Sequence, residues 1–207
     1  MPKVATRVDV DALMARLVEE PPDDDVDGRV LAAASAIVAQ SGLRGLEVDE
    51  VARRSGVGRS TIYRRFTDRN LLLAATLAHD ARRFLGALAG AVEEIDDLED
   101  QVVAAFAAGL RVAERTGLGE LVRSEPLLLR LLTVDSGPLL LAATQQLVAL
   151  AALHDPQVDH ASAAGAAEVL VRLAISFVVA PETSLRLADD DIENTVRRHV
   201  APLVNTG

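Results

Sequence analysis

The stretch from Val48 to Phe66, VDEVARRSGVGRSTIYRRF, constrains the fold of this 207-residue chain more than any other. Apolar or small residues recur there at i, i+3, i+4 and i+7, which predicts a short helix with one buried stripe: Val48, Val51, Ala52 and Ser55. Gly56 follows where the chain must leave that helix, because glycine adopts the left-handed backbone conformation at little cost. A second short helix then buries Ile62 and Phe66. The spacing of Ala52, Gly56 and Ile62 predicts a helix-turn-helix.

The outer face of the second helix carries side chains suited to DNA. Arginines pair with phosphates or contact guanine bidentately, and hydroxyl groups donate to phosphates or base edges. The residues of this face are Arg59, Ser60, Thr61, Tyr63, Arg64 and Arg65. An arginine-rich helix alone is usually only a solvated surface. Here the charge, the turn and the buried pair coincide, so we interpret the face as DNA-binding.

The net charge of -10 is unevenly distributed along the chain. Residues 27–90 hold ten basic and six acidic side chains, net +4. Residues 1–26 hold three basic and seven acidic side chains, and residues 91–207 hold eight and eighteen. Only the segment with the helix-turn-helix is positive. An acidic remainder is repelled by phosphates, which leaves one face of the molecule to dock on DNA.

From about Gly28 to Leu77 the chain resembles the DNA-binding domain of the tetracycline-repressor (TetR) family of transcriptional regulators. The run GVGRSTIYRRFTDRNLLL, from Gly56 to Leu73, is similar to that family's recognition helix followed by the start of its long fourth helix. The resemblance implies a homodimer that binds palindromic operator DNA through the head and a small-molecule effector through a helical body.

The resemblance also implies roles for single residues. Thr61 and Arg64 would approach base edges, while Tyr63 and Arg65 would contact the DNA backbone. Arg69, at the start of the next helix, matches a basic position that holds a phosphate.

Three residues depart from the family's pattern. Glu47 stands where a threonine or serine usually caps the helix, and Gly58 replaces a common serine cap. Asp49 places an acid on a face that approaches DNA.

The whole sequence predicts an all-α protein in three parts. Half of the residues are hydrophobic and 2% are aromatic, with Ala, Leu and Val dominant, which favours helices over strands. Residues 1–26 are predicted to form a flexible acidic arm, since its end, EEPPDDDVD, disfavours packing. Residues 27–73 are predicted to form the three-helix head with the helix-turn-helix, and residues 74–207 a helical ligand-binding and dimerisation bundle.

Helix boundaries follow from caps and breaks. Asp27 is the expected cap of a first helix from Gly28 to Gln40, and Pro126 is expected to open a helix. Other helices are predicted at about 69–94, 101–115, 138–153 and 160–179, and after Asp191.

The last two helices are predicted to form a homodimer interface, because small residues let helices from two subunits approach closely. A dimer also suits the head, since two recognition helices on a symmetry axis read a palindrome about one helical turn apart. The alternative is that these helices only complete a monomeric core; the family resemblance favours the interface. The expected contacts are Ala163, Ala167, Leu170, Phe177, Val196 and Val200.

The body is expected to enclose a pocket for an apolar effector, since leucine and alanine dominate there. An effector that prefers one spacing of the two heads would shift the protein away from its DNA-competent state. The expected pocket residues are Phe84, Phe106, Leu110, Gln145 and Gln146. We expect a repressor, because no segment beyond head and body is apparent for contacting polymerase.

An alternative function of a different class is that of a helical enzyme, which would use the acidic cluster Asp96–Asp100, DDLED, to hold magnesium. No second aspartate-rich motif accompanies it, and acids before a helix are ordinary partners of the helix dipole. A second acidic and histidine cluster, around Asp155 and Asp159, has no familiar ligand spacing. We therefore expect no metal, no cofactor and no catalysis.

The chain has no cysteine and no expected secretion signal. Its best apolar run, from Pro138 to Leu153, is too short to span a bilayer. We expect a cytoplasmic protein without a membrane partner.

Overall fold

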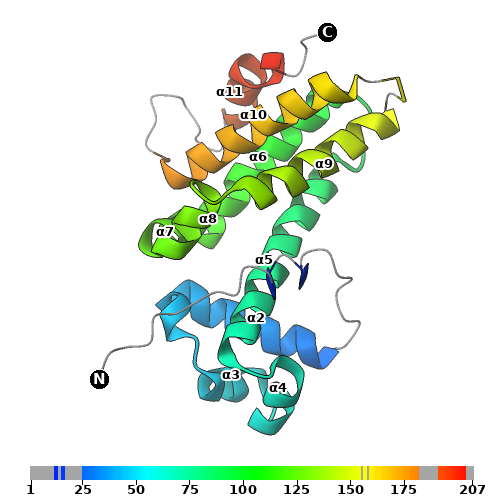
Figure 1. Ribbon diagram of the computed structural model, residues 1–207. Helices are drawn as coiled ribbons and strands as arrows, with labels where there is room; N and C mark the ends of the chain where they lie inside the picture. The colour runs from blue at the N-terminus through cyan, green and yellow to red at the C-terminus, as the bar shows by residue number, and fades with distance from the viewer. Residues whose placement is uncertain are drawn as a thin grey trace. The chain divides into compact units, whose positions relative to one another are not determined.

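The computed structural model describes residues 12, 13, 15, 16, 25–154, 156, 157, 159–181 and 191–203. All the secondary structure within these residues is helical, which confirms the predicted all-α class (Figure 1). The chain divides into two compact units, Met1–Leu85 and Gly86–Gly207, called here the head and the body. This division and the boundary predicted after residue 73 both lie inside the long helix Arg69–Val92. Most of the predicted arm over residues 1–26 lies outside the described residues.

The head is built from short helices and most of one long helix. They are α2 (Asp25–Ser41), the 3-10 turn η1 (Leu43–Gly45), α3 (Val48–Ser55), α4 (Arg59–Phe66) and α5 (Arg69–Val92). α2 packs against η1 and α3, and α3 packs against α4. α2 begins at Asp25, so Asp27 lies in its first turn and is not its cap.

The residues predicted to be buried in the helix-turn-helix form part of the head's core. Ile62 and Phe66 are 1% and 3% exposed, and Val57 is buried in the turn between α3 and α4. Gly56 ends α3 with φ 69°, and its N–H donates to the Ala52 carbonyl, as its position predicted. Burial of a side chain such as Ile62 contributes roughly 1.5–3 kcal/mol, so it holds α4 firmly on α3.

The body is a bundle that continues from the last residues of α5. It contains α6 (Leu98–Thr116), α7 (Leu118–Ser124), α8 (Pro126–Leu132), α9 (Gly137–His154), α10 (His160–Val179), α11 (Ile192–His199) and the 3-10 turn η2 (Ala201–Leu203). α9 and α10 lie side by side along their length (Figure 1). Pro126 stands in the first turn of α8 and α10 has its predicted limits, whereas α7 was not predicted. Gly117, with φ 66°, turns the chain from α6 directly into α7.

The core of the body joins α6 to α10 and α11. The Phe106 and Phe177 rings meet edge to face, with centroids 6.2 Å apart and an interplanar angle of 86°. Val196 and Val200, which were predicted to contact a second subunit, are 1% and 4% exposed and lie in this cluster. In the subunit they therefore pack against α6 and present almost no surface to a partner.

Candidate nucleic-acid interface

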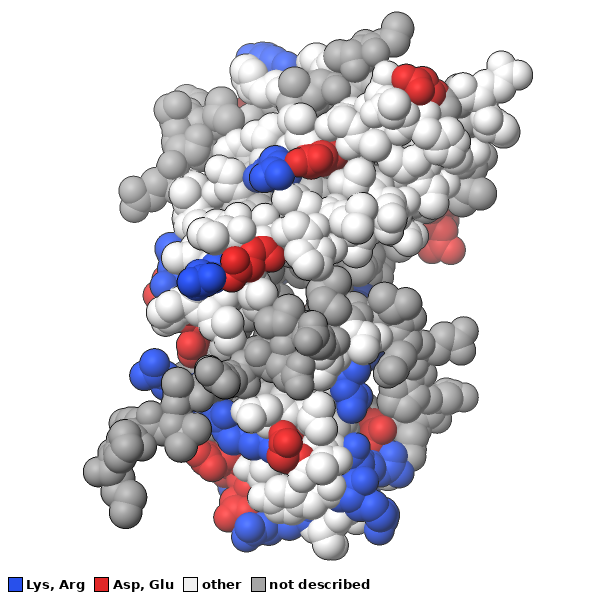
Figure 2. Space-filling model, viewed as in Figure 1, with Lys and Arg blue, Asp and Glu red and all other residues white. Residues whose placement is uncertain are grey.

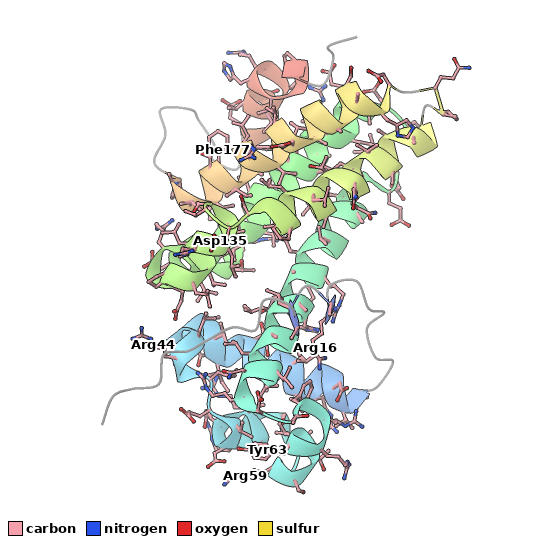
Figure 3. The ribbon with its side chains drawn as sticks, in the orientation of Figure 1. Arg16, Arg44, Arg59, Tyr63, Asp135 and Phe177 are labelled. Carbon is pink, nitrogen blue, oxygen red and sulfur yellow. The ribbon has the colours of Figure 1, made fainter. Side chains whose placement is uncertain are left out.

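The recognition helix α4 has one buried and one polar side. Ile62 and Phe66 hold the buried side. The polar side exposes Arg59, Ser60, Tyr63 and Arg64, while Thr61 and Arg65 are half-buried. Figure 3 shows Arg59 and Tyr63 at the outer edge of the head, where α3 and α4 meet. The predicted polar face is therefore accessible at its most DNA-like residues.

Two of the three α4 arginines are paired with acids inside the head. Arg59 Nε lies 2.8 Å from Asp49 Oδ1, and both side chains are exposed. Arg65 Nη1 donates to Asp27 Oδ1 at 2.8 Å, where the two side chains are 28% and 13% exposed. Arg64 makes no ion pair with the residues that the structure describes. The charge of Arg64 is thus available to DNA, whereas Arg65 is held toward α2.

Arg69 is occupied by the head itself. Its Nε donates to the Leu46 carbonyl at 2.7 Å, and its Nη2 donates to the Leu43 carbonyl at 2.7 Å and the Arg44 carbonyl at 3.3 Å. The guanidinium thereby ties the start of α5 to η1 and to the segment that leads into α3. The family resemblance assigns this residue to a phosphate contact. Within the described part of the chain, Nε and Nη2 already donate to carbonyl groups and Nη1 does not.

Glu50 neutralises two further arginines on α3. It accepts hydrogen bonds from Arg53 and from Arg54, the latter at 2.6 Å. These bonds lower the pKa of Glu50 from 4.5 to about 2, so the carboxylate stays ionised at any physiological pH. Arg54 also donates to Gln40 Oε1 at 2.8 Å. Both arginines are therefore screened before any phosphate approaches.

Sequence reasoning missed Arg44. This arginine is exposed on η1, and its side chain extends away from the helices (Figure 3). It is available to phosphate, and the only sequence signal for it was a basic residue just before the helix-turn-helix.

A partly buried polar contact joins α5 to α2. Ser35 Oγ donates to Asp80 Oδ1 at 2.6 Å. Burial raises the pKa of Asp80, and burial lowers the pKa of the neighbouring His79. Asp80 is therefore a carboxyl group whose ionisation opposes the folding of the head.

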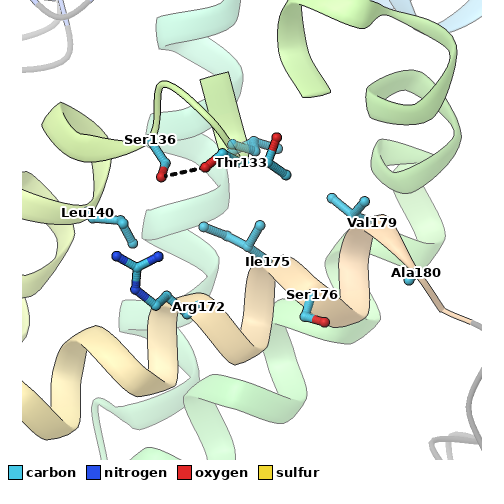
Figure 4. Close-up of a pocket in the computed structure, with 9 residues that line it drawn as sticks. Thr133, Ser136, Leu140, Arg172, Ile175, Ser176, Val179 and Ala180 are labelled. Carbon is cyan, nitrogen blue, oxygen red and sulfur yellow. Dashed lines mark hydrogen bonds between the residues drawn. The ribbon is translucent and has the colours of Figure 1, made fainter. Parts of the chain in front are cut away.

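A groove of about 270 Å³ lies in the body among α8, α9 and α10 (Figure 4). Its wall mixes apolar side chains with hydroxyl groups and one cation. The lining residues are Leu132, Thr133, Ser136, Leu140, Arg172, Ile175, Ser176, Val179 and Ala180. Ser136 Oγ donates to the Thr133 carbonyl at 3.1 Å, and Arg172 pairs with Glu168 at 2.7 Å. The site suits a small, mostly apolar molecule with one polar group.

The residues predicted to line a pocket do not line this groove. Phe106 and Leu110 belong to the core around α6. Gln145 and Gln146 are exposed on α9, and Phe84 is half-buried on the part of α5 that belongs to the head.

The acidic clusters have structural partners. Asp97 caps α6 by accepting from the Asp100 N–H at 2.9 Å, and Asp100 pairs with Arg197 at 2.6 Å. Asp159 caps α10 by accepting from two backbone N–H groups. The hydrogen bond from the Ser162 hydroxyl, followed by those two backbone bonds, lowers the pKa of Asp159. Among the described residues no three acids or histidines are placed to hold a metal ion. Asp155 lies outside the described residues.

The predicted interface residues on α10 are largely covered. Ala167 is buried, Ala163 is half-buried, and Leu170 and Phe177 pack against the body core. The exposed apolar surface lies elsewhere on the helix pair, with Leu141 60% exposed on α9 and Val169 44% exposed on α10. Figure 2 shows the region over α9 and α10 as nearly free of charge.

α10 is also long and apolar enough to cross a membrane, and only 11% of its apolar window is buried in the subunit. One such helix is weak evidence for a membrane. Its Glu168–Arg172 ion pair lies in mid-helix, where a bilayer penalises charge.

Two protein-family models match the chain, one over the head and one over the body. The model for bacterial regulatory proteins of the tetR family matches residues 30–76, and the model for a bacterial tetracyclin repressor C-terminal domain matches residues 97–198. Together they cover more than two thirds of the chain. The chain belongs to the TetR family. The curated relatives and family models describe helix-turn-helix transcriptional regulators, and the head of this chain carries the corresponding helix-turn-helix in α3 and α4.

The relatives agree with this assignment. Uncharacterised HTH-type transcriptional regulators of Mycobacterium tuberculosis (strain H37Rv) and Mycobacterium bovis are each 29% identical to it over 123 residues, which cover 52% of this chain. The chain spans 65% of the length of these curated relatives.

Solved TetR structures share the fold. The TetR family repressor AlkX from Dietzia sp. strain DQ12-45-1b, implicated in biodegradation of n-alkanes, gives a TM-score of 0.63 at 24% identity, over 85% of this chain and 96% of that one. A TetR-like regulator from Rhodococcus sp. RHA1 gives 0.50 at 21% identity, over 88% and 99%.

Proposed function

We propose that this TetR protein is a repressor that binds a palindromic operator as a homodimer and is released by a small, mostly apolar effector. The observation that carries the proposal is α4 itself. Its buried side packs into the head through Ile62 and Phe66. Its opposite side exposes Arg59, Tyr63 and Arg64. A helix of this kind fits the major groove with its N-terminal residues at the base edges.

The test is selection of genomic fragments by the purified full-length chain at physiological salt. We expect one short palindrome to be enriched, and Arg64→Ala to lose most of that enrichment while the protein stays folded. Binding should also weaken steeply between 50 and 200 mM salt, because paired phosphates release counterions. Fragments without a shared sequence, or an affinity that does not change with salt, would count against the proposal.

The homodimer is best supported by the mostly apolar surface of α9 and α10. A large exposed apolar surface on a soluble chain marks an interaction site. Leu141 on α9 and Val169 on α10 are exposed apolar residues of this helix pair, whereas Val134, which is 75% exposed, lies in the turn between α8 and α9. We expect Leu141→Glu and Val169→Glu to give monomers in sedimentation equilibrium and Val134→Glu to remain dimeric. A dimeric Leu141→Glu/Val169→Glu chain would place the interface elsewhere.

The effector is proposed to bind the groove among α8, α9 and α10. The hydroxyl groups of Thr133 and Ser136 and the Arg172 guanidinium supply polar contacts, and leucine, isoleucine and valine side chains supply the rest. Binding there would favour one arrangement of the dimer and shift the population away from DNA. Small apolar compounds should raise the melting temperature of the wild type and not of Ile175→Trp, whose larger ring fills the groove. Equal shifts in both proteins would remove the groove as the site.

The regulator is proposed to act in the cytoplasm, where the operator is. A second subunit over α10 explains its exposed apolar residues without a bilayer.

A further inference from the structure

One ion pair crosses from the first helix of the helix-turn-helix to the start of the recognition helix. Asp49 lies in the first turn of α3, and Arg59 is the first residue of α4 after the extended Gly58. Asp49 Oδ1 and Arg59 Nε are 2.8 Å apart, and the side chains are 66% and 60% exposed. The pair therefore lies at the surface, at the end of α4 that enters a major groove first.

We propose that Asp49 is a positioning residue for base recognition, which holds the Arg59 guanidinium toward a guanine in each operator half-site. The inference rests on the proposed function, since it concerns the reading of that operator. Asp49 uses the Nε side of the guanidinium. The two Nη groups then remain as a parallel pair of donors, and such a pair matches guanine O6 and N7 in the major groove.

The other ion pairs of the head do not have this geometry. Arg65 is half-buried and paired with Asp27 on α2. Glu50 pairs with Arg53 and Arg54, which belong to α3 itself. Among the described residues, the Asp49–Arg59 pair alone connects α3 to an exposed arginine of α4.

Stability does not explain the pair. An exposed ion pair contributes almost nothing to folding, because water screens it and both side chains lose rotamer freedom. An acid on a DNA-facing surface also repels phosphates. Its useful effect is on Arg59, because a long side chain that is already oriented loses less conformational freedom when it binds a base.

A simpler explanation for Asp49 is a favourable interaction with the helix dipole at the start of α3. Glu50 lies in the same turn, carries the same charge and has no contact with α4 among those described above, so it is a matched control. Removal of either acid changes the dipole interaction and the net charge alike. Only removal of Asp49 releases Arg59.

The experiment is selection from a random DNA library by the full-length wild type and by Asp49→Ala, Asp49→Asn, Glu50→Ala, Arg59→Ala and Arg59→Lys. We expect the wild-type site to hold a guanine in one column of each half-site, with roughly 5- to 100-fold preference over the other bases. Arg59→Ala and Arg59→Lys should lose the preference in that column. Asp49→Ala should weaken it in the same column and leave the other columns intact, and Asp49→Asn should have a smaller effect. Glu50→Ala should keep the column.

The double variant Asp49→Ala/Arg59→Ala separates positioning from general charge. It should match Arg59→Ala alone at the guanine column, because Asp49 acts through Arg59. Uniformly tighter binding of all sequences by Asp49→Ala, with the column unchanged, would overturn the inference and show only relief of repulsion. The same loss in Glu50→Ala would also overturn it. If the wild type enriches no sequence, the proposed function itself fails and this inference with it.

Discussion

Arg69 offers a direct test between a structural role and contact with DNA. Its guanidinium donates to the carbonyl groups of Leu43, Leu46 and Arg44, so the geometry predicts that it stabilises the head. Its place in the family pattern predicts instead that it holds a phosphate. The perturbations are Arg69→Met, which keeps most of the length without the charge, and Arg69→Lys, which keeps the charge without the fork of donors.

The magnitude follows from the hydrogen bonds. A bond from a charged donor contributes about 1.5–3 kcal/mol, and Arg69 makes two at 2.7 Å and a longer one. Arg69 is half-buried, so water recovers part of the loss. We therefore expect Arg69→Met to lower the free energy of unfolding of the head by about 2–4 kcal/mol. Arg69→Lys should lose nearly as much, because a compact ammonium cannot reproduce the planar fork.

The chain provides its own probe for this measurement. Tyr63 is its only tyrosine and it has no tryptophan, so intrinsic fluorescence during urea unfolding reports on the head. Arg64→Ala is the control, since Arg64 is exposed and makes no ion pair with described residues; it should stay within about 0.5 kcal/mol of the wild type.

DNA binding distinguishes the two roles. If Arg69 is structural, folded Arg69→Met should keep the wild-type dependence of affinity on salt. The structural role would be refuted if Arg69→Met made the slope of log affinity against log salt shallower by about 0.9 while its free energy of unfolding stayed at the wild-type value. In that case Arg69→Lys should restore the wild-type slope.

Three further predictions concern single side chains. Phe106→Ala should destabilise the body by about 3–5 kcal/mol in urea unfolding followed by far-UV circular dichroism, because it removes the ring that contacts Phe177; a loss below about 1 kcal/mol would contradict this. Gly56→Ala should lower the free energy of unfolding by about 1 kcal/mol, measured by Tyr63 fluorescence, because φ is 69° there and a side chain is strained at that angle. An unchanged free energy of unfolding would mean that the turn relaxes. Burial raises the pKa of Asp80 above its unfolded value, so its favourable contribution is present below the unfolded pKa and is lost as pH rises through the raised one. Asp80→Asn should therefore gain more stability relative to the wild type at pH 7 than at pH 4, and an equal difference at both values would show that burial does not control Asp80.

The head was predictable because its signals are local. The apolar stripe of α3, the turn at Gly56 and the pair Ile62 and Phe66 lie within nineteen residues. The structure confirms the turn and the buried pair, and it buries Val48 and Val51 of the stripe while Ala52 and Ser55 are half-buried. The partners of the arginines were not predictable, because Arg65 reaches 38 residues back to Asp27 and Arg69 reaches 26 residues back to Leu43. Spacing along one helix carries no information about such contacts.

The helical class of the body and most of its helix limits were predictable. Which surface each apolar stripe packs against was not. The stripe on α11 that includes Val196 and Val200 fits a partner subunit or the subunit's own core equally well, and only tertiary packing decides for the core. The groove beside Arg172 depends on how three helices meet, so no sequence pattern could identify its lining. In contrast, the small residues of α10 were visible in the sequence, but how far the subunit's own core covers that helix was not.

The acids that accompany the arginines of α3 and α4 have a consequence for how such a protein finds its site on a chromosome. Glu50, Asp49 and Asp27 each neutralise arginines of the helix-turn-helix. Fewer unpaired cations mean weaker attachment to arbitrary sequences, and a genome offers about 10⁶–10⁹ of these as decoys. The regulator would dissociate sooner from each decoy and spend more of its time scanning. Even a few molecules per cell could then keep one operator occupied through contacts to bases rather than through the bulk of their charge.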